Sequence, residues 1–333
     1  RERGLQEGDS IALLGRNHRY FVIALIAIVQ LGARVLLLNT MASKAQLTDL
    51  AEREGAELLI VDEEFLPLVD EVRRSRLIVA WADDKENLEV PTIANVILGK
   101  PHGDQPVPKS RGQIVIFTSG TTGLPKGAKR REPDDLKPMI AYFGAIPFTG
   151  NSVVVVAAPL FHSWGLLNFG FAQTTVPTVV LRRRFDPEQT LADIEKYRAK
   201  VLVVVPLMVQ RLANLPDEVS SKYDVSSLQI TASSGSSLPG DVPTRFMDKY
   251  TDSLYNFYGA TETSWVTIAS PQDLRDAPGT AGRIPWRTTV RILDSDGNEL
   301  PNGEIGVLHV LIDMPFGGYT DGRSRAVPDG LID

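Results

Sequence analysis

The sequence predicts an α/β protein with a small antiparallel β-structure towards its C-terminal end. Up to Tyr258, short apolar runs alternate with segments whose apolar residues recur at helical spacing. Strands that are apolar throughout, and not only at every second residue, are typical of parallel sheets covered by helices on both faces. From about residue 275, strand pairs joined by turn residues replace this pattern, and they predict a small antiparallel β-barrel.

Strands and helices alternate in the first part of the chain. The expected strands cover residues 11–14, 35–38, 58–61 and 114–117, and the expected helices cover residues 20–31 and 45–54. The second helix is amphipathic and ends at Gly55, a residue type that commonly follows a helix C-terminus. A connector with several prolines, residues 83–112, leads to the fourth strand.

The second part of the chain continues this alternation. Strands are expected at 153–157, 179–181, 201–205, 228–232 and 254–258, and helices at 187–197 and 239–250. Asp186 followed by Pro187 is typical of a helix N-terminus. Further on, expected strands at 290–293 and 305–310 enclose the turn residues Asp294-Ser295-Asp296-Gly297.

Composition and charge limit the classes of function. With 333 residues, of which 43% are hydrophobic, the chain can bury a large core and form two or three subdomains. A net charge of −6 gives no basic footprint of the kind that nucleic-acid binders carry. Cysteine is absent, which excludes disulfides, thiolate metal sites and cysteine nucleophiles. The longest apolar run, residues 21–29, is too short to span a bilayer, and no secretory signal is visible, so we expect a cytoplasmic protein.

A loop rich in glycine and hydroxyl groups follows the strand at 114–117. It reads Thr118-Ser119-Gly120-Thr121-Thr122-Gly123-Leu124-Pro125-Lys126-Gly127. Its glycines allow backbone N–H groups to turn around an anion, its hydroxyls add rotatable donors, and Lys126 adds a positive charge. These features suit a nucleoside triphosphate, although Pro125 and Gly127 depart from the pattern G-x-x-x-x-G-K-[ST]. Taken alone, such a stretch could also be a solvated surface loop.

A second motif, Tyr258-Gly259-Ala260-Thr261-Glu262, follows the strand at 254–258. Binding residues of α/β sheets collect at such strand ends. Tyr258 offers a flat face for a purine, Thr261 can donate to a phosphate oxygen, and Glu262 is a hard oxygen ligand suited to Mg²⁺. The alternative for the motif in isolation is a capped turn with an exposed acid.

Two more stretches each follow an expected strand. Ser234-Gly235-Ser236-Ser237-Leu238 also reads as an ordinary helix N-cap. Phe161-His162-Ser163-Trp164-Gly165 places a histidine among aromatic residues, where it is more often packed in a core than catalytic. This stretch contains no carboxylate.

In this order, the motifs resemble those of the acyl-adenylate-forming (AMP-binding) superfamily, which includes acyl-CoA synthetases, peptide-synthetase adenylation domains and luciferases. Residues 118–127 are similar to the family's phosphate loop, and residues 258–262 match its Y-G-x-T-E motif. Weaker matches at 279–285 (G-x-x-G-x-P) and 300–306 (L-P-x-G-E-x-G) keep the family order, so the resemblance covers nearly the whole chain. Ser236 departs from the family, which more usually has a glycine there.

The resemblance implies two packed, helix-flanked sheets (αβαβα), a small C-terminal antiparallel β-barrel, and a mobile C-terminal domain that this chain lacks. We expect a first α/β subdomain with the phosphate loop at 1–185, a second with the adenine and acyl site at 186–270, and the barrel at 271–333. The family's ribose-binding aspartate and catalytic lysine would follow Asp333, so residues 1–333 alone are expected to be inactive.

The resemblance also implies roles for individual residues, with adenine stacked on Tyr258 and its amine facing Asn256. The implied catalytic residues are Lys126, His162, Thr261 and Glu262, of which Glu262 would hold Mg²⁺. Nucleotide is expected to contact Thr118, Ser119, Gly120, Thr121, Thr122, Gly123, Lys126, Ser234, Gly235, Ser236, Asn256, Tyr258, Gly259 and Thr261. The acid is expected to contact His162, Trp164, Val205 and Gly235, with Trp164 as a gate to the acyl tunnel.

The implied reaction is ATP-dependent activation of a carboxylic acid to an acyl-adenylate and then to acyl-CoA, with ATP, Mg²⁺ and coenzyme A. In the family's amino-acid-activating domains an aspartate in the stretch that corresponds to 161–165 pairs with the substrate ammonium group, and burial of that group without a counter-charge would be costly. Residues 161–165 contain no carboxylate, so we expect an acid without an α-amino group, and specifically a medium- to long-chain fatty acid. Further expectations are peripheral membrane contact for a lipid substrate, a homodimer, and no nucleic-acid partner. A carrier-protein thiol is an alternative acceptor. The alternatives of function are an amino-acid- or aryl-acid-activating adenylation domain and a non-catalytic nucleotide-binding module.

Overall fold

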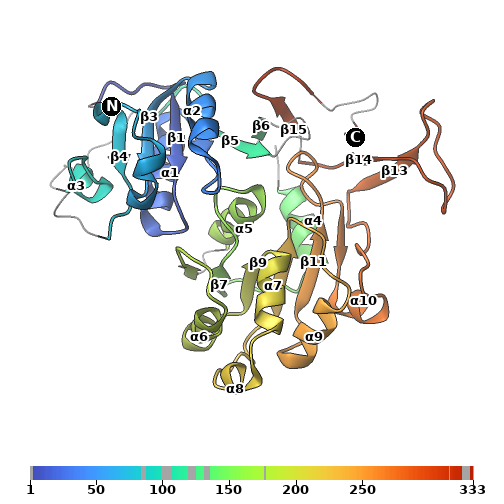
Figure 1. Ribbon diagram of the computed structural model, residues 1–333. Helices are drawn as coiled ribbons and strands as arrows, with labels where there is room; N and C mark the ends of the chain where they lie inside the picture. Colours follow the sequence, from blue (N-terminus) through green and yellow to red (C-terminus); the bar gives the residue numbers. More distant parts are fainter. Residues whose placement is uncertain are drawn as a thin grey trace. The chain divides into compact units, whose positions relative to one another are not determined.

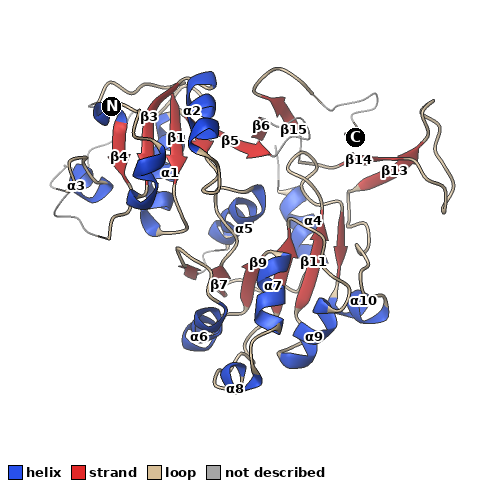
Figure 2. Cartoon of the chain, viewed as in Figure 1, coloured by secondary structure: helices blue, strands red, loops and turns tan. Residues whose placement is uncertain are grey.

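The computed structural model describes residues 3–83, 88–98, 107–118, 125–130, 136–175, 178–314, 316–324 and 331–332. The chain divides into two compact units (Figure 1). The first comprises Arg1–Arg130 and Gly317–Arg323, and the second comprises Arg131–Phe316 and Ser324–Asp333. Each unit is built around its own sheet, and Figure 2 shows the helices that accompany these sheets.

The first unit contains a seven-stranded sheet in the order β15-β6-β5-β2-β1-β3-β4. The strands are β1 (Ser10–Leu14), β2 (Arg34–Leu37), β3 (Ala56–Val61), β4 (Leu77–Val79), β5 (Gln113–Thr118), β6 (Lys126–Arg130) and β15 (Phe316–Tyr319). Strands β1 to β5 pair in parallel, as their uninterrupted apolar sequences predict, whereas β6 is antiparallel to β5. Strand β15 was expected in the barrel region and instead joins this sheet.

Helices α1 (Arg19–Leu31) and α2 (Lys44–Arg53) connect the first three strands. Ser43 and Gln46 form a capping box at the start of α2, and Gly32 ends α1 in the left-handed conformation that glycine adopts without strain. Alternate side chains of β1 point to opposite faces of the sheet. Ala12 and Leu14 lie on one face, in a core cluster with Leu47 and Leu50 of α2. The shorter helical segments of this unit are η1 (Glu63–Leu68), η2 (Arg74–Arg76) and α3 (Ile93–Ile97).

The second unit contains a six-stranded sheet in the order β12-β11-β10-β9-β7-β8. Its strands are β7 (Val153–Val156), β8 (Thr178–Leu181), β9 (Val201–Val204), β10 (Ile230–Ser234), β11 (Leu254–Tyr258) and β12 (Thr267–Ala269). Its helices are α4 (Lys137–Ala145), α5 (Ser163–Thr174), α6 (Pro187–Tyr197), α7 (Pro206–Ala213), α8 (Asp217–Ser220), α9 (Val242–Lys249) and α10 (Pro271–Asp276). Only β12 pairs in the antiparallel sense among the strand pairs described for this sheet.

The two faces of this second sheet carry different helices. Leu202 and Val204 of β9 belong to a core cluster with residues of α6, α7 and α9, and Figure 1 shows α7 in front of the strands. Val201 and Val203, which alternate with them, line a cavity together with residues of α4 and α5. The sheet is therefore covered on both sides, as parallel strands require.

The C-terminal part of the second unit contains an antiparallel pair, β13 (Thr289–Leu293) and β14 (Val307–Leu311). An isolated antiparallel bridge joins Val310 of β14 to Ile332. The predicted antiparallel pairing is thus confirmed, although the described residues form a two-stranded sheet and not a closed barrel. The predicted subdomain boundary at residue 185 lies between β8 and α6. Strands on both sides of this boundary, β7 and β8 before it and β9 to β12 after it, belong to the second sheet. No helix in the described ranges is both long and apolar enough to cross a membrane.

Candidate functional site

Several of the predicted motifs of the second unit meet at the carboxyl ends of its parallel strands. Strands β9, β10 and β11 are neighbours in the sheet, and β7 pairs with β9. Helix α5 begins at Ser163 after β7, while Val205, Gly235 and Gly259 directly follow β9, β10 and β11. Motifs that lie up to a hundred residues apart in sequence therefore share one edge of the sheet, which is where open α/β sheets bind ligands.

The loop after β11 is compact. Val266 N donates to Tyr258 O at 2.7 Å and closes the base of the loop, and Ala260 N donates to Thr263 Oγ1 at 3.1 Å inside it. A Cβ on Gly259 would lie 1.9 Å from Ser264 O, so only glycine allows this close backbone approach. The loop that carries Thr261 and Glu262 is thus held in one shape by its own backbone.

Helix α5 starts next to this loop. The hydroxyl oxygens of Ser163 and Thr261 are 3.2 Å apart, a hydrogen bond between residues 98 positions apart in sequence. The first turn of α5 packs closely on the preceding segment, because a Cβ on Gly165 would lie 2.3 Å from Pro159 O. The stretch Phe161–Gly165 and the Y-G-x-T-E loop are therefore in direct contact.

His162 is the N-cap residue of α5, and its side chain makes no capping hydrogen bond. The residue is exposed, but its ring packs on Phe161 with 4.4 Å between ring centroids. Partial desolvation by the surrounding protein lowers the pKa of the His162 imidazole below its usual value. A neutral imidazole at pH 7 can accept a hydrogen bond or hold an apolar contact beside a bound acid without adding charge.

Three of the residues expected to contact the acid lie around the end of β9. Trp164 Nε1 donates to Val204 O at 2.8 Å, which fixes the indole over this strand end. A Cβ on Gly235 would lie 3.8 Å from Val205 Cγ1, so Gly235 and Val205 are neighbours. Gly235 has a φ of 105°, in the left-handed region that favours glycine.

The expected adenine-contacting residues lie on β11, and one neighbour on β10 was not predicted. Tyr258 is 47% exposed, so its ring is accessible to a flat ligand. Asn256 is paired in register with Ser233 of β10, which places both side chains on the same face of the sheet. The buried Asn256 Oδ1 and Ser233 Oγ make no hydrogen bond with any part of the chain that the structure describes. Unpaired buried polar atoms are costly, so a polar ligand atom here would be favourable.

The phosphate loop belongs to the first unit and is described only at its ends. Residues 119–124, which include the predicted Ser119, Gly120, Thr121, Thr122 and Gly123, lie outside the described residues. Thr118 and Lys126 pair at the end of the β5–β6 hairpin, and Lys126 Nζ lies 5.5 Å from the centre of the Tyr319 ring. That ATP contacts this loop and the 256–262 segment together stays a prediction.

Comparison with known proteins gives the family. Residues 1–320 match the family described as AMP-binding enzyme. The chain belongs to this AMP-binding enzyme family. The computed fold agrees, because it matches the solved structure of the amide bond synthetase McbA from Marinactinospora thermotolerans with a TM-score of 0.84 at 22% identity. That match covers 99% of this chain and 67% of the synthetase.

Two curated relatives of this AMP-binding enzyme are similar in sequence. It is 28% identical to "4-coumarate--CoA ligase-like 8" of Arabidopsis thaliana over 312 residues, which are 89% of this chain and 56% of the relative. It is 29% identical to a feruloyl-CoA synthase of an Amycolatopsis species over 340 residues, which are 100% of this chain and 65% of the relative. The chain therefore spans somewhat more than half the length of these relatives.

The residues of this AMP-binding enzyme fit the Mg²⁺ that the family implies. Mg²⁺ is usually held by one or two carboxylates together with substrate phosphates and water. Glu262 is a half-buried carboxylate on the compact loop, and it is the candidate ligand. Within the described ranges, no group of three or more His, Asp or Glu residues could hold a metal, so these described residues alone offer no complete metal cage.

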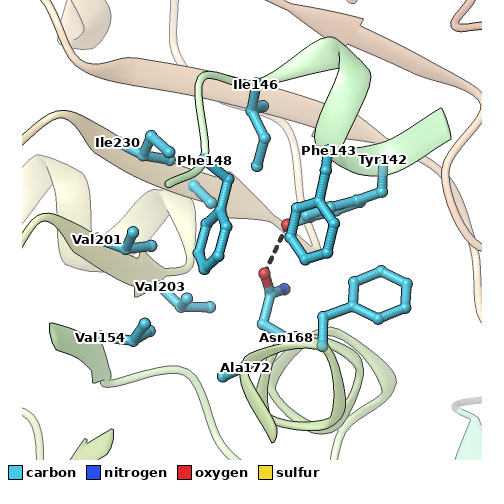
Figure 3. A pocket seen from close by; sticks show the side chains of 12 residues that line it. Tyr142, Phe143, Ile146, Phe148, Val154, Asn168, Ala172, Val201, Val203 and Ile230 are labelled. Atoms are coloured by element: carbon cyan, nitrogen blue, oxygen red, sulfur yellow. Dashed lines mark hydrogen bonds between the residues drawn. The ribbon is translucent and has the colours of Figure 1, made fainter. Parts of the chain in front are cut away.

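An interior cavity lies between α4, α5 and the sheet of the second unit (Figure 3). Its volume is about 10 Å³, roughly what one water molecule requires. The lining is mostly apolar and aromatic: Tyr142, Phe143, Ile146, Phe148, Val154, Asn168, Phe171, Ala172, Val201, Val203, Ile230 and Ala232. As Figure 3 shows, the Tyr142 hydroxyl donates to Asn168 Oδ1, at 2.5 Å.

Asn168 connects this cavity to Trp164. Asn168 Nδ2 donates to Trp164 O at 2.9 Å, one turn earlier in α5. The Tyr142 ring stacks on Phe257 at 5.2 Å, and Phe257 in turn contacts Trp164. Burial raises the pKa of the Tyr142 hydroxyl far above its ordinary value, so the group stays a neutral donor.

We expect Tyr142→Phe to lower the free energy of unfolding by about 1–2 kcal/mol, because Asn168 Oδ1 would remain buried without its donor. Urea unfolding of the purified protein measures the change. Tyr197→Phe is the matched control, since Tyr197 is 38% exposed and its substitution should change stability by less than about 0.5 kcal/mol. Equal effects of the two substitutions would show that the Tyr142–Asn168 bond contributes nothing.

The roles of Ser163, Ser233 and the Tyr142–Asn168 pair were not predicted. Their partners are 98, 23 and 26 residues away in sequence, so no local pattern marks them. For Ser163, the only local signal would have been its hydroxyl within the Phe161–Gly165 stretch. That signal does not identify Thr261 as the hydrogen-bond partner.

Proposed function

We propose that the full-length protein is an AMP-forming acid–thiol ligase that uses ATP and coenzyme A. The observation that carries this proposal is the arrangement of the second unit, where Tyr258, Thr261 and His162 lie at one edge of a sheet. Curated relatives named as CoA ligase-like and as CoA synthase support coenzyme A as the thiol. A thiol on a carrier protein is the alternative acceptor.

In the first step, a carboxylate oxygen of the acid attacks the α-phosphorus of ATP, and pyrophosphate leaves. In the second step, the CoA sulfur attacks the acyl carbon, its proton is lost, and AMP leaves. Thr261 would donate to an α-phosphate oxygen, and Lys126 would bring positive charge to the ATP phosphates. Mg²⁺, when bound by Glu262 and the phosphates, would offset negative charge that develops on the phosphoryl oxygens. The chain's own donors act by position, so no covalent enzyme nucleophile is needed.

The acid should have an apolar body and no α-amino group. Residues 159–175 contain no Asp or Glu, so an ammonium group bound beside His162 would find no counter-charge in this segment. We propose that the acyl group extends from His162 past Trp164 along α5. The predicted medium- to long-chain fatty acid would need the cavity behind Trp164 to open, because its present volume suits a single water.

An aryl acid is the second candidate substrate. An aryl group would need the cavity to open as well, and the aromatic lining would then favour a flat, compact group, since aromatic rings pack well in offset or edge-to-face arrangements. The names of the two relatives, which refer to 4-coumarate and feruloyl groups, agree with this candidate. Fatty and aryl acids need separate assay arms.

The test is ATP–pyrophosphate exchange by the full-length protein with four acids. 3-Phenylpropanoate and phenylalanine differ only by the α-amino group, and we expect the former to react at least about a hundredfold faster, because an unpaired buried charge costs several kcal/mol. Decanoate tests the fatty arm, and acetate tests the need for an apolar body. Best turnover with phenylalanine or acetate would contradict the proposal.

Two further outcomes separate the alternatives. Mg²⁺-dependent ATP binding without any pyrophosphate exchange would favour a non-catalytic nucleotide-binding module. The relatives contain residues beyond those that match this chain, so residues 1–333 are assayed beside the full-length protein, and we expect the shorter chain to form little acyl-CoA.

A further inference from the structure

The hydrogen bond between Ser163 and Thr261 links the start of α5 to the loop expected to hold the α-phosphate. Ser163 Oγ and Thr261 Oγ1 are 3.2 Å apart, and both side chains are half-buried. The bond lies beside the phosphate that Thr261 is proposed to contact.

Both ends of the bond are rigidly supported. On one side, Gly259 approaches Ser264 closely and the Ala260–Thr263 bond holds the turn that presents Thr261. On the other side, the indole of Trp164 donates to the backbone of β9, directly after Ser163 in α5. The two oxygens are thereby held within hydrogen-bond distance, and by position alone either hydroxyl could be the donor.

The direction of this bond follows from what each hydroxyl must do. A hydroxyl carries one proton to donate and two lone pairs that accept. If Thr261 donates its proton to a phosphate oxygen, it can meet Ser163 only as an acceptor, so the Ser163 proton must point at Thr261 Oγ1. Accepting a hydrogen bond also polarises the Thr261 O–H and strengthens its own donation.

We infer that Ser163 is a positioning residue for adenylate formation: its hydroxyl donates to Thr261 Oγ1 and thereby directs the Thr261 proton at the α-phosphate. This inference rests on the proposed function for the role of Thr261. The sequence of contacts is Ser163 Oγ–H to Thr261 Oγ1, then Thr261 O–H to a phosphate oxygen. A purely structural bond, in which Thr261 donates to Ser163, is the alternative.

An isosteric pair of variants separates the two. Ser163→Thr keeps the hydroxyl and Ser163→Val has nearly the same shape without it, so both carry the same β-branched side chain at the first position of α5. In the full-length protein, we expect Ser163→Val to lower kcat for pyrophosphate exchange roughly tenfold relative to Ser163→Thr, with KM for the acid unchanged. This tenfold decrease in kcat is smaller than the loss on removal of a direct donor, which is on the order of a hundred- to thousandfold.

The dependence on Thr261 is measured in a Thr261→Ala background. In this background, Ser163→Val and Ser163→Thr should have equal kcat. The two variants differ only in the hydroxyl at position 163, and the Thr261 hydroxyl that it would direct is absent. Equal kcat of the two variants in the wild-type background would overturn the inference, and so would an undiminished difference in the Thr261→Ala background.

Failure of the proposed function gives a different result. If the wild-type protein binds MgATP but exchanges no pyrophosphate with any acid, the proposed reaction is wrong, and the same pair is compared in affinity for MgATP. Weaker binding by Ser163→Val than by Ser163→Thr would still support the directed hydrogen bond, and equal affinities would overturn it. A wild-type protein that binds no MgATP would overturn both proposals.

Discussion

Glu262→Gln should slow acyl-adenylate formation by the full-length protein at least about a hundredfold, the scale on which preorganised charge acts on a phosphoryl transition state. The substitution keeps the shape of the side chain and removes the negative charge that suits Mg²⁺. The loop around it is held by Gly259 and by the Ala260–Thr263 bond, so the backbone should keep its shape. Pyrophosphate exchange at limiting and at saturating Mg²⁺ measures the effect, and the deficit should be larger at limiting Mg²⁺.

Glu304→Gln is the matched control for this substitution. Glu304 is an exposed carboxylate in the turn before β14, and the same change of charge there should leave the rate within about twofold. Thermal unfolding in the absence of Mg²⁺ should be similar for both variants. Activity of Glu262→Gln within a few-fold of the wild-type protein at limiting Mg²⁺ would show that Glu262 is not the metal ligand.

The strands of both sheets were predictable because each is a short apolar run between breakers. Strand β9, residues 201–204, is bounded by Lys200 and Pro206, and a parallel strand buried on both faces needs such a continuous apolar sequence. From the sequence, Pro206 only follows the end of the strand predicted at 201–205. In the structure it is also the first residue of α7, a position that suits proline because the missing N–H would have no partner there.

Helix α5 was missed for a different reason. Its sequence places glycine, polar and large apolar residues on several sides of the helix, so no single apolar stripe marks it. Both of its sides meet protein, since Trp164 and Asn168 face buried partners while Ser163 meets the loop after β11. Strand β6 was missed because its polar sequence has no strand pattern, and its pairing with β5 follows from the hairpin.

The place of the candidate site could be predicted, but its internal hydrogen bonds could not. Motifs that each follow a strand must meet at one edge when those strands are parallel, and this places Gly235 beside Val205. The Ser163–Thr261 and Tyr142–Asn168 bonds depend on how α4, α5 and the loop after β11 pack in three dimensions. No spacing in the sequence encodes that packing.

Gly259→Ala should abolish measurable adenylate formation and lower the free energy of unfolding by about 3 kcal/mol, at the upper end of what overpacking costs. The added Cβ would lie 1.9 Å from Ser264 O and 2.9 Å from Trp265 Cα. Both are backbone atoms, which cannot turn aside as a flexible side chain can. The loop must open, and Thr261 and Glu262 then move away from the positions that the loop gives them.

Gly170→Ala separates this steric effect from a general effect of replacing glycine. Gly170 lies in α5, nothing is within 4 Å of the place where its Cβ would lie, and alanine there should stabilise the helix by up to about 1 kcal/mol. Pyrophosphate exchange and urea unfolding are measured on both variants. If Gly259→Ala retained both activity and stability at the level of Gly170→Ala, the loop would have another shape than the one described, and the assignment of Thr261 and Glu262 to the phosphate and metal would lose its geometric support.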